Sequence, residues 1–473
     1  MSVAESPAAP TPASAPPGSS PEPPRGALLS PAVRQELRAT LELAWPVVVT
    51  QLGTMAMSLV DIAMVAPLGA DALAGVGIGS SIHWMFATLL FGVLLALDPL
   101  ISQAWGAGEH ERVPILAWQG TWIAIFGGAV VGLLHLNGRW IFTLLDQPDA
   151  VADQAAAYFG GMAGGVMPFL LFVVGRSLLG GMGITRPVMV VTLLANGVNA
   201  LADWVLIRGA FGAPKLGALG AGLATTTTRW AMVVALLLYL LRFRQRLDLR
   251  PRRPDAARIA RIFRIGMPIG LQNAAEFGVF AAAGTFAGWL GAEALAAHQV
   301  ALNLAAFAFM VPVGVSVAAA IRVGQAIGAG APDDAARAGK VAMALGAAFM
   351  AATGLVFLSF PGLLAERFGG EPEVIARATD LLRIAAAFQV ADGIQVVASG
   401  ALRGAGDTRT AMVANLIAHW CFGLPFGYAL AFWAGLGAKG LWWGLTGSLI
   451  VAAALLAGLF LRGGWRRLGR VHA

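Results

Sequence analysis

Long apolar runs dominate this chain and restrict what it can fold into. The 473 residues are 58% hydrophobic and only 12% charged, whereas soluble domains carry about 25% charged residues. Apolar stretches of about 20 residues recur, and a helix of that length crosses the ~30 Å hydrocarbon layer of a bilayer. We therefore expect an all-α polytopic membrane protein. Its twelve transmembrane helices are predicted at residues 43–66, 76–101, 116–135, 155–180, 186–208, 217–241, 262–290, 296–322, 338–360, 378–402, 409–432 and 438–462.

A segment of six predicted helices occurs twice. Residues 68–74 read LGADALA, and residues 290–296, which lie 222 positions later, read LGAEALA. At the same offset, QAWGAG at 103–108 corresponds to QAIGAG at 325–330. Because each repeat holds an even number of spans, the two repeats are predicted to be parallel rather than inverted. Such a duplication is typical of transporters built from two similar halves around a central path.

Polar segments divide the chain into two lobes. Residues 1–28 are rich in Pro, Ala and Ser and are expected to be disordered, and they lack the pattern of a signal peptide. An arginine-rich linker at 242–261 separates an N-lobe at 29–241 from a C-lobe at 262–462, and a basic tail covers 463–473. This arginine distribution predicts a multi-pass protein of the bacterial plasma membrane with both termini and the linker in the cytoplasm. Because the net charge of +7 comes from these flanking loops, nucleic acid is not an expected partner.

Polar side chains on three N-lobe spans predict a cation site. An ionisable group at mid-membrane costs at least about 2.5–3.5 kcal/mol, so few persist without a function or a partner. Carboxylate, amide and hydroxyl oxygens are ligands that Na⁺ accepts, and two close carboxylates could equally share a proton. Hydrogen bonds that only join the helices are the alternative. Helical spacing groups Gln51, Thr54, Ser58 and Asp61 on the first span and Asn196, Asn199 and Asp203 on the fifth, while Thr225 and Thr226 begin the sixth.

The C-lobe carries a second pair of acidic residues. Glu276 follows Gln272 and Asn273 by about one turn, and Asp392 follows Gln389 on another span. The repeat offset aligns Glu276 with Thr54 and Asp61 with Ala283, so the acidic residues of the two lobes are not equivalent. We expect either a second acidic centre or a hydrogen-bonded helix contact. The predicted substrate cavity comprises Gln51, Ser58, Asn196, Gln272, Asn273, Phe280, Gln389 and Met310.

Searches for enzymatic and nucleotide-binding motifs are negative. The single cysteine, Cys421, excludes an internal disulfide and a cysteine metal cluster. GVGIGS at 75–80 follows no predicted strand, and neither GxxxxGK[ST] nor HExxH occurs. We therefore expect no enzymatic activity and no cofactor, and an ion gradient is the expected energy source of any active transport.

Three long segments of the membrane part have a distinctive sequence. The first span reads AWPVVVTQLGTMAMSLVDIAMVAPLGADALAGVGIG. The seventh and eighth read GMPIGLQNAAEFGVFAAAGTFAGWLGAEALAAHQVALN, followed by IRVGQAIGAG. The tenth and its exit read FQVADGIQVVASGALRGAGDTR. In combination these segments are highly specific, and by them the chain resembles the multidrug and toxic compound extrusion (MATE) family, most closely its bacterial NorM-like branch. The resemblance extends from about residue 41 to residue 461.

This resemblance implies a V-shaped pair of six-helix lobes. It also implies efflux of small amphipathic, often cationic drugs or dyes in exchange for Na⁺ or H⁺ by alternating access, and a chain that acts as a monomer in the bilayer. Asp61, Glu276 and Asp392 match acidic residues of the family on the first, seventh and tenth helices. Asn199 and Asp203 resemble the pair that builds the first-lobe cation site in other branches, with Thr225 or Thr226 as its hydroxyl. Na⁺ is expected at Asp61, Asn199 and Asp203.

Two other classes of membrane transport protein remain as alternatives. A flippase for a lipid-linked precursor on a related two-lobe fold would favour a cationic cavity for a pyrophosphate, whereas the mid-membrane groups in this sequence are mainly acidic. An ion channel usually repeats a re-entrant filter loop, and the sequence contains no such element.

Overall fold

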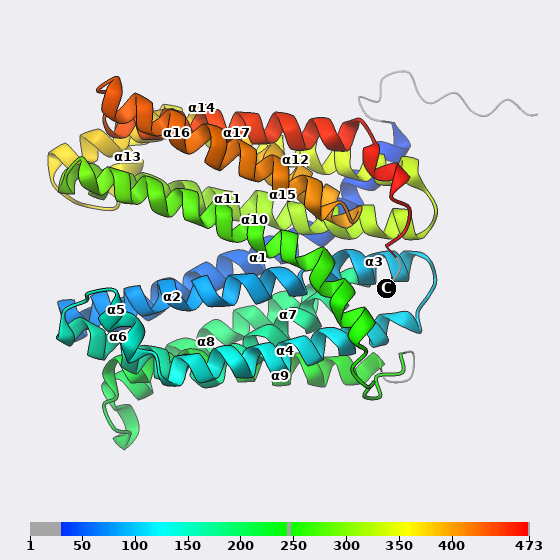
Figure 1. The fold of residues 1–473 in the computed structure, drawn as a ribbon, viewed down its shortest axis with the longest axis horizontal. Coiled ribbons are helices and arrows are strands. Elements are labelled where there is room, and N and C mark those ends of the chain that lie inside the picture. Colours follow the sequence, from blue (N-terminus) through cyan, green and yellow to red (C-terminus); the bar gives the residue numbers. More distant parts are fainter. Residues whose placement is uncertain (1–29, 244–246, 472–473) are drawn as a thin grey trace, which may run out of the picture.

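The computed structural model describes residues 30–243 and 247–471, which are almost entirely helical. The predicted disordered tail at 1–28 lies outside this range. The helices form two bundles (Figure 1). The first contains α1 (Pro31–Val65), α2 (Ala70–Leu94), α3 (Leu97–Gly106), α4 (Arg112–Leu136), α5 (Arg139–Leu144), α6 (Asp149–Met162), α7 (Val166–Gly181), α8 (Arg186–Arg208) and α9 (Gly217–Leu240). The second contains α10 (Ala256–Trp289), α11 (Ala292–Gly328), α12 (Pro332–Ser359), α13 (Pro361–Glu366), α14 (Pro372–Gly404), α15 (Thr408–Leu416), α16 (Leu424–Tyr428) and α17 (Ala438–Leu461).

The predicted transmembrane helices are confirmed, because each of the twelve apolar segments falls on helical structure. Eleven helical segments in the described part of the chain are long and apolar enough to cross a membrane. The seventh predicted span corresponds to α10, which is not among these eleven and carries Gln272, Asn273 and Glu276. Three other spans are interrupted helices: α2 continues as α3, α6 continues as α7, and π-helical turns at Ile417–Gly423 and Ala429–Trp433 flank α16.

The predicted linker is shorter than expected and is held against the N-terminal bundle. Its last six residues, 256–261, belong to α10, because Asp255 caps that helix by accepting hydrogen bonds from the amides of Ala257 and Arg258. Upstream, the indole nitrogens of Trp118 and Trp122 on α4 donate to the carbonyls of Leu249 and Arg252, at 3.2 and 2.8 Å. The residues described between the two bundles therefore follow a defined path along α4.

The sequence repeat gives a repeat of local structure. Gly69 and Gly291 precede α2 and α11 and have nearly the same backbone angles, φ 110° with ψ 172° and φ 114° with ψ 165°. Residues with a Cβ atom rarely adopt a positive φ of this size, which explains why glycine occupies both positions. The motif LGA[DE]ALA thus encodes the same tight entry into a helix in each bundle.

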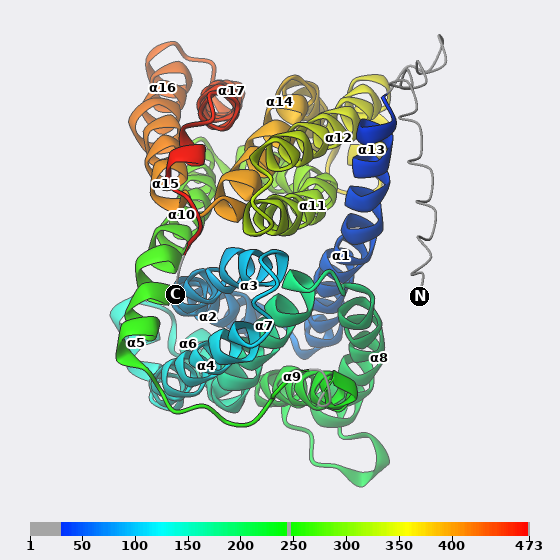
Figure 2. The same ribbon diagram turned by 90° about the vertical axis from the view of Figure 1, so that its right-hand side faces the viewer.

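Small residues make the contact between the bundles. Figure 2 shows α1 and α10 crossing the boundary on opposite sides, where α1 packs against α11 and α10 packs against α2. A Cβ atom added to Gly92 on α2 would lie 2.1 Å from Cα of Gly270 on α10. At the equivalent crossing, a Cβ atom on Gly314 of α11 would lie 2.4 Å from a methyl carbon of Val48 on α1. Small residues permit such close backbone approach between membrane helices.

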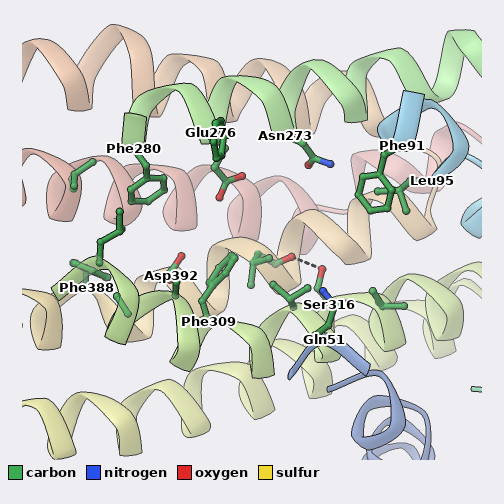
Figure 3. Close-up of a pocket in the computed structure, with 18 of the residues that line it drawn as sticks. Gln51, Phe91, Leu95, Asn273, Glu276, Phe280, Phe309, Ser316, Phe388 and Asp392 are labelled. Atoms are coloured by element: carbon green, nitrogen blue, oxygen red, sulfur yellow. Dashed lines mark hydrogen bonds between the residues drawn. The ribbon is translucent and has the colours of Figure 1, made fainter. Parts of the chain in front are cut away.

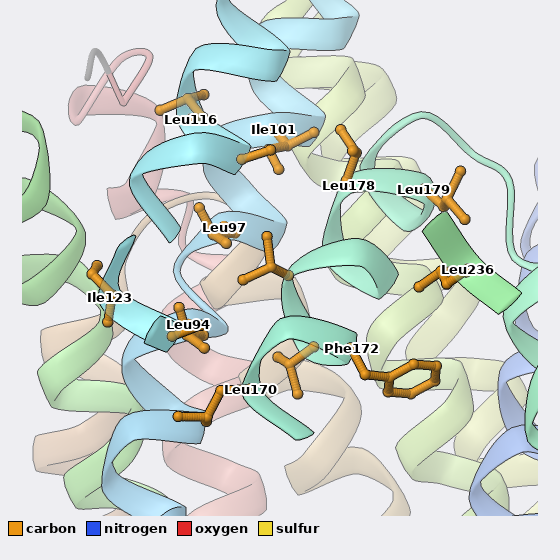
Figure 4. Packing of buried hydrophobic residues seen from close by; sticks show 14 of the residues in the cluster. Leu94, Leu97, Ile101, Leu116, Ile123, Leu170, Phe172, Leu178, Leu179 and Leu236 are labelled. Carbon is orange, nitrogen blue, oxygen red and sulfur yellow. The ribbon is translucent and has the colours of Figure 1, made fainter. Parts of the chain in front are cut away.

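Each bundle has its own apolar core. In the first bundle, Leu97 and Ile101 of α3 are fully buried in one cluster with Leu170 and Leu179 of α7 and apolar residues of α4 (Figure 4). Separate clusters fill the second bundle around α11, α14 and α17. Ile262 and Ile265 of α10 join the first cluster, and Ala44 of α1 joins a cluster of the second bundle, so the two crossing helices link the cores.

The glycine contact between α2 and α10 can be tested by adding one methyl group. We expect Gly92→Ala to lower the thermal stability of the purified protein by several degrees, because overpacking costs about 1–3 kcal/mol. Gly77→Ala on the same helix is the matched control, since its Cβ atom would meet no heavy atom within 4 Å. Thermal unfolding in detergent, followed by size-exclusion chromatography, measures both variants. Equal stability of the two variants would contradict the tight crossing.

Candidate functional site

A cavity of about 380 Å³ lies between the bundles, mostly within the second one. Helices α10, α11, α14 and α17 form most of its wall, and α1, α2 and α7 close it from the first bundle. This volume is in the range of cavities that hold drug-sized molecules, about 300–1,000 Å³. Its polar or charged lining residues include Gln51, Arg176, Asn273, Glu276, Asp392 and Arg403, and its aromatic lining residues are Phe91, Phe277, Phe280, Phe309, Phe388 and Trp442.

The two acidic residues predicted in the C-lobe meet at this cavity. Glu276 projects from α10 and Asp392 from α14, and Figure 3 shows both carboxyl groups directed into the space between these helices. The side chain of Gln395, one turn beyond Asp392, reaches Glu276. Neither acid forms a salt bridge within the described part of the chain. Both can therefore attract a positive group that enters the cavity.

Two arginines that were not predicted from the sequence to line the cavity do line it. Arg176 lies on α7 and Arg403 near the end of α14. Asp98 lines an adjoining space with Arg176. One oxygen of Asp98 and one outer nitrogen of Arg176 are buried and have no hydrogen-bond partner in the structure. A lone arginine within the apolar run LLFVVGRSLLGG was the available signal, because such a residue in a membrane span usually faces a polar interior.

The aromatic walls make the cavity amphipathic. Phe280, predicted to line it, does so together with Phe309 and Phe388 (Figure 3). The indole nitrogen of Trp442 donates to Nδ1 of His298 at 3.1 Å, which fixes the orientation of this large ring. Flat apolar surfaces next to two carboxyl groups suit a ligand that is itself part apolar and part cationic.

The N-lobe residues form a separate acidic site between α1, α8 and α9. One carboxylate oxygen of Asp61 accepts a hydrogen bond from the amide nitrogen of Asn199 at 3.0 Å, and the other accepts from the hydroxyl of Thr225 at 3.4 Å. Asp203 is fully buried one turn after Asn199, and its carboxyl group reaches that of Asp61. Thr226 points elsewhere, because its hydroxyl donates to the carbonyl of Gly161 at 2.7 Å.

Several oxygens at this site are buried without a donor. They are Oδ1 of Asn199 and both carboxylate oxygens of Asp203, and none accepts a hydrogen bond from a described donor. An unpaired buried acceptor costs about 1–3 kcal/mol, and a buried charge costs more. A proton shared between the two carboxyl groups would remove part of this cost. A cation bound by these oxygens together with Asp61 and Thr225 would also remove it.

A buried chain of hydrogen bonds adjoins this acidic site. Arg229 lies one turn after Thr225 on α9 and contacts Nε2 of His83 through both outer nitrogens at 3.2 Å. Nδ1 of His83 lies 2.9 Å from Nε2 of His135, whose Nδ1 lies 2.7 Å from the carbonyl of Val131. Since that carbonyl can only accept, both histidines satisfy the chain as neutral rings protonated on Nδ1. The arrangement holds a fixed arginine beside the acidic pair.

Five residues predicted to line the cavity lie outside its lining. On the first bundle, the hydroxyl of Ser58 and the amide nitrogen of Asn196 turn back to carbonyls four residues earlier on their own helices. Such local bonds compete with any longer-range contact. In the second bundle, Gln272 donates to Ser399 at 2.9 Å and Gln389 donates to Thr353 at 3.4 Å. The residues concerned are Ser58, Asn196, Gln272, Gln389 and Met310, whereas the predicted residues Gln51, Asn273 and Phe280 do line the cavity.

The chain is similar to known transport proteins along nearly its whole length. Among curated relatives, the multidrug resistance protein NorM of Burkholderia vietnamiensis is 38% identical over 445 residues, which is 92% of this chain and 96% of the relative. A probable multidrug resistance protein NorM of Mesorhizobium japonicum is also 38% identical, over 91% of this chain and 94% of its own length.

Solved structures share the fold. The eukaryotic MATE transporter AtDTX14 superposes with a TM-score of 0.82 at 22% identity, covering 92% of this chain and 98% of that one. The Vibrio cholerae MATE transporter VcmN in its bent form gives a TM-score of 0.82 at 20% identity, covering 93% and 99%. Residues 46–205 and 268–429, one segment in each bundle, match the MatE family. The chain is a member of the MatE family.

Proposed function

We propose that this protein is a secondary active multidrug efflux transporter that exchanges Na⁺, H⁺ or both for amphipathic, often cationic drugs by alternating access. The observation that carries this proposal is the pair of carboxyl groups, Glu276 and Asp392, on an aromatic cavity between the two bundles. The names of the curated relatives, which are multidrug resistance proteins, support it. The substrate is carried unchanged, and a single chain holds the complete cavity.

The energetics require the ion to weaken the binding of the drug rather than to pull the drug out. Two unit charges 4 Å apart attract by about 4 kcal/mol at an effective dielectric constant of 20. One charge that crosses 100 mV supplies only about 2.3 kcal/mol. A drug held by Glu276 and Asp392 is therefore released only if ion binding favours a state in which these residues hold the drug less tightly. The ion drives the cycle only if it binds the inward-facing and outward-facing states with different affinity.

We assign the coupling ion to the site of Asp61, Asn199, Asp203 and Thr225. Its oxygens are hard ligands that suit Na⁺, and its two adjacent carboxyl groups equally suit a shared proton. The buried oxygens of Asn199 and Asp203 that lack donors support this assignment. Arg229, one turn from Thr225, supplies a fixed positive charge that limits how many further cations the site can hold.

The orientation of the chain in the membrane follows from its basic segments. Pro31, the residues before α10 and the C-terminal tail lie at the same end of the molecule (Figure 1). Arginines are frequent in the linker and in the tail, and cytoplasmic loops carry the excess of Lys and Arg. We therefore place this end, with both termini, on the cytoplasmic side of the bacterial plasma membrane.

A flippase for a lipid-linked precursor is the second candidate, because Arg176 and Arg403 also line the cavity. Two guanidinium groups suit a pyrophosphate. They are balanced by the carboxyl groups of Glu276 and Asp392, so the lining has no net positive charge. Flipping of a pyrophosphate lipid by the purified protein, without accumulation of a cationic dye, would favour this candidate.

Neutralising the acidic residues should separate the roles of the two sites. In inverted membrane vesicles loaded with Na⁺ or with acid, we expect the wild-type protein to accumulate a fluorescent cationic dye. Glu276→Gln and Asp392→Asn should lower dye transport about tenfold or more, since loss of 1.4 kcal/mol of attraction corresponds to tenfold. Asp61→Asn and Asp203→Asn should abolish the dependence on the ion gradient. Asp71→Asn, which removes an exposed carboxylate at the start of α2, is the control. Full coupled transport by all four variants would contradict both site assignments.

The hydroxyl ligand of the cation site can be tested by an isosteric change. Thr225→Val removes the hydroxyl next to Asp61 and keeps the shape of the side chain. We expect the Na⁺ concentration for half-maximal dye exchange to rise about fivefold, which corresponds to about 1 kcal/mol. Thr227→Val is the matched control, because that hydroxyl is exposed and donates to the carbonyl of Leu223 on the same helix. If both variants behave like the wild type, Thr225 is not a ligand.

A further inference from the structure

The second repeated motif, QAxGAG, joins the bundles at the end where the linker and tail lie. On α3, the side-chain nitrogen of Gln103 donates to the carbonyl of Gly404 across the boundary at 2.9 Å. On α11, the side-chain nitrogen of Gln325 donates to the carbonyl of Gly181 at 3.0 Å. Gln103 and Gln325 are equivalent in the repeat, and so are Gly181 and Gly404, with an offset of one. The two hydrogen bonds are therefore reciprocal.

The acceptors are the C-terminal carbonyls of two helices. Gly181 is the last residue of α7, and Gly404 is the last residue of α14. The last four carbonyls of a helix have no partner within that helix. Each glutamine thus caps a helix of the opposite bundle. If the bundles separate, water can replace the glutamine, so the contact can break without leaving a buried acceptor unsatisfied.

Glycines bring the two motifs into direct backbone contact. A Cβ atom on Gly106 would lie 2.0 Å from the carbonyl oxygen of Gln325, and a Cβ atom on Gly328 would lie 2.1 Å from the carbonyl oxygen of Gln103. The obstructing atoms belong to the backbone, so a side chain at either position would force the bundles apart. Arg403, which lines the cavity, directly precedes Gly404, and this places the contact at the floor of the cavity.

The C-terminal tail makes the contact asymmetric. The backbone amide of Val471 donates to the side-chain oxygen of Gln103 at 2.7 Å. Beside it, Arg470 lies 3.9 Å from Glu109. Figures 1 and 2 show this tail descending from α17 in the second bundle toward α3 in the first. Within residues 30–243 and 247–471, no backbone donor binds Gln325 in the corresponding way. The side-chain amide of Gln103 is therefore held through both its nitrogen and its oxygen.

We propose that Gln103 and Gln325 form the gate that closes the cavity on the linker side, and that the C-terminal tail latches this gate through Gln103. This inference rests on the proposed transport function, because a gate has a role only where the cavity opens alternately to two sides. Opening toward the linker side breaks both glutamine bonds and the ion pair of Arg322 with Glu36, which also joins the bundles and measures 2.7 Å. It also detaches the amide of Val471 from Gln103.

The gate can be tested by measuring the distance between the bundles. Spin labels at Glu111 and Lys340, both exposed on that side, report the separation in a background in which Cys421 is replaced by Ser. We expect Gln103→Leu and Gln325→Leu each to raise the population of the long distance about fivefold, the factor that corresponds to one hydrogen bond of ordinary net strength. Gly106→Ala should shift the distribution in the same direction. Unchanged distributions in folded Gln103→Leu and Gln325→Leu proteins would overturn the gate.

The latch has its own matched pair of variants. Val471→Pro removes the donor amide, whereas Val471→Ala keeps it and also shortens the side chain. We expect the proline variant, and not the alanine variant, to populate the long distance more than the wild type. Equal distributions for the two would overturn the latch. These measurements need neither drug nor ion gradient. A wild-type protein that exports no dye while the distances respond as expected would therefore contradict the proposed function and leave the gate standing.

Discussion

The contact between the two bundles depends on close approach of backbone to backbone. Gly92 meets Gly270 on one flank, Gly314 meets Val48 on the other, and Gly106 and Gly328 meet the opposing glutamine backbones at the floor. At these glycines no side chain obstructs a rotation of one bundle against the other, whereas Ile262 and Ile265 of α10 pack in the core of the first bundle. A boundary of this kind suits rigid-body motion of two repeats around a central site. The positions of the glycines, more than any single attraction, make two states of one structure physically accessible.

The acidic residues divide between two environments, and this division is compatible with exchange. Asp61 and Asp203 lie within the first bundle, where an amide and a hydroxyl already donate to Asp61. Glu276 and Asp392 face open space with aromatic walls. The first environment has oxygen ligands for a proton or a small ion, and the second can accept an organic cation. Since the sites are separate, the ion need not displace the drug physically. It can act by changing which state of the two bundles is favoured.

The sequence predicted the helices, because they depend on local periodicity. Run length identified the spans, and helical spacing placed Asn199 and Asp203 on one face, where the structure brings them to Asp61. The sequence did not correctly predict all the residues that line the cavity, because the lining depends on the rotation of each helix about its own axis. Ser58 and Asn196 donate hydrogen bonds to carbonyls of their own helices, and the sequence does not indicate these bonds. Arg176 was missed because a single charge in an apolar run does not indicate which space it faces.

The two repeats share the contacts that join the bundles but differ in the positions of their acidic residues. These two features have different physical reasons. The glycine crossings, the glutamine bonds and the helix entries at Gly69 and Gly291 occur as equivalent pairs. Pairing is needed there, because a boundary that rocks evenly must offer matching contacts on both bundles. The acidic residues are not equivalent, since Asp61 corresponds to Ala283 and Glu276 to Thr54. An exchanger carries a small ion in one half-cycle and a large organic molecule in the other, so identical sites in both lobes would not distinguish the ion from the drug and could not separate their paths.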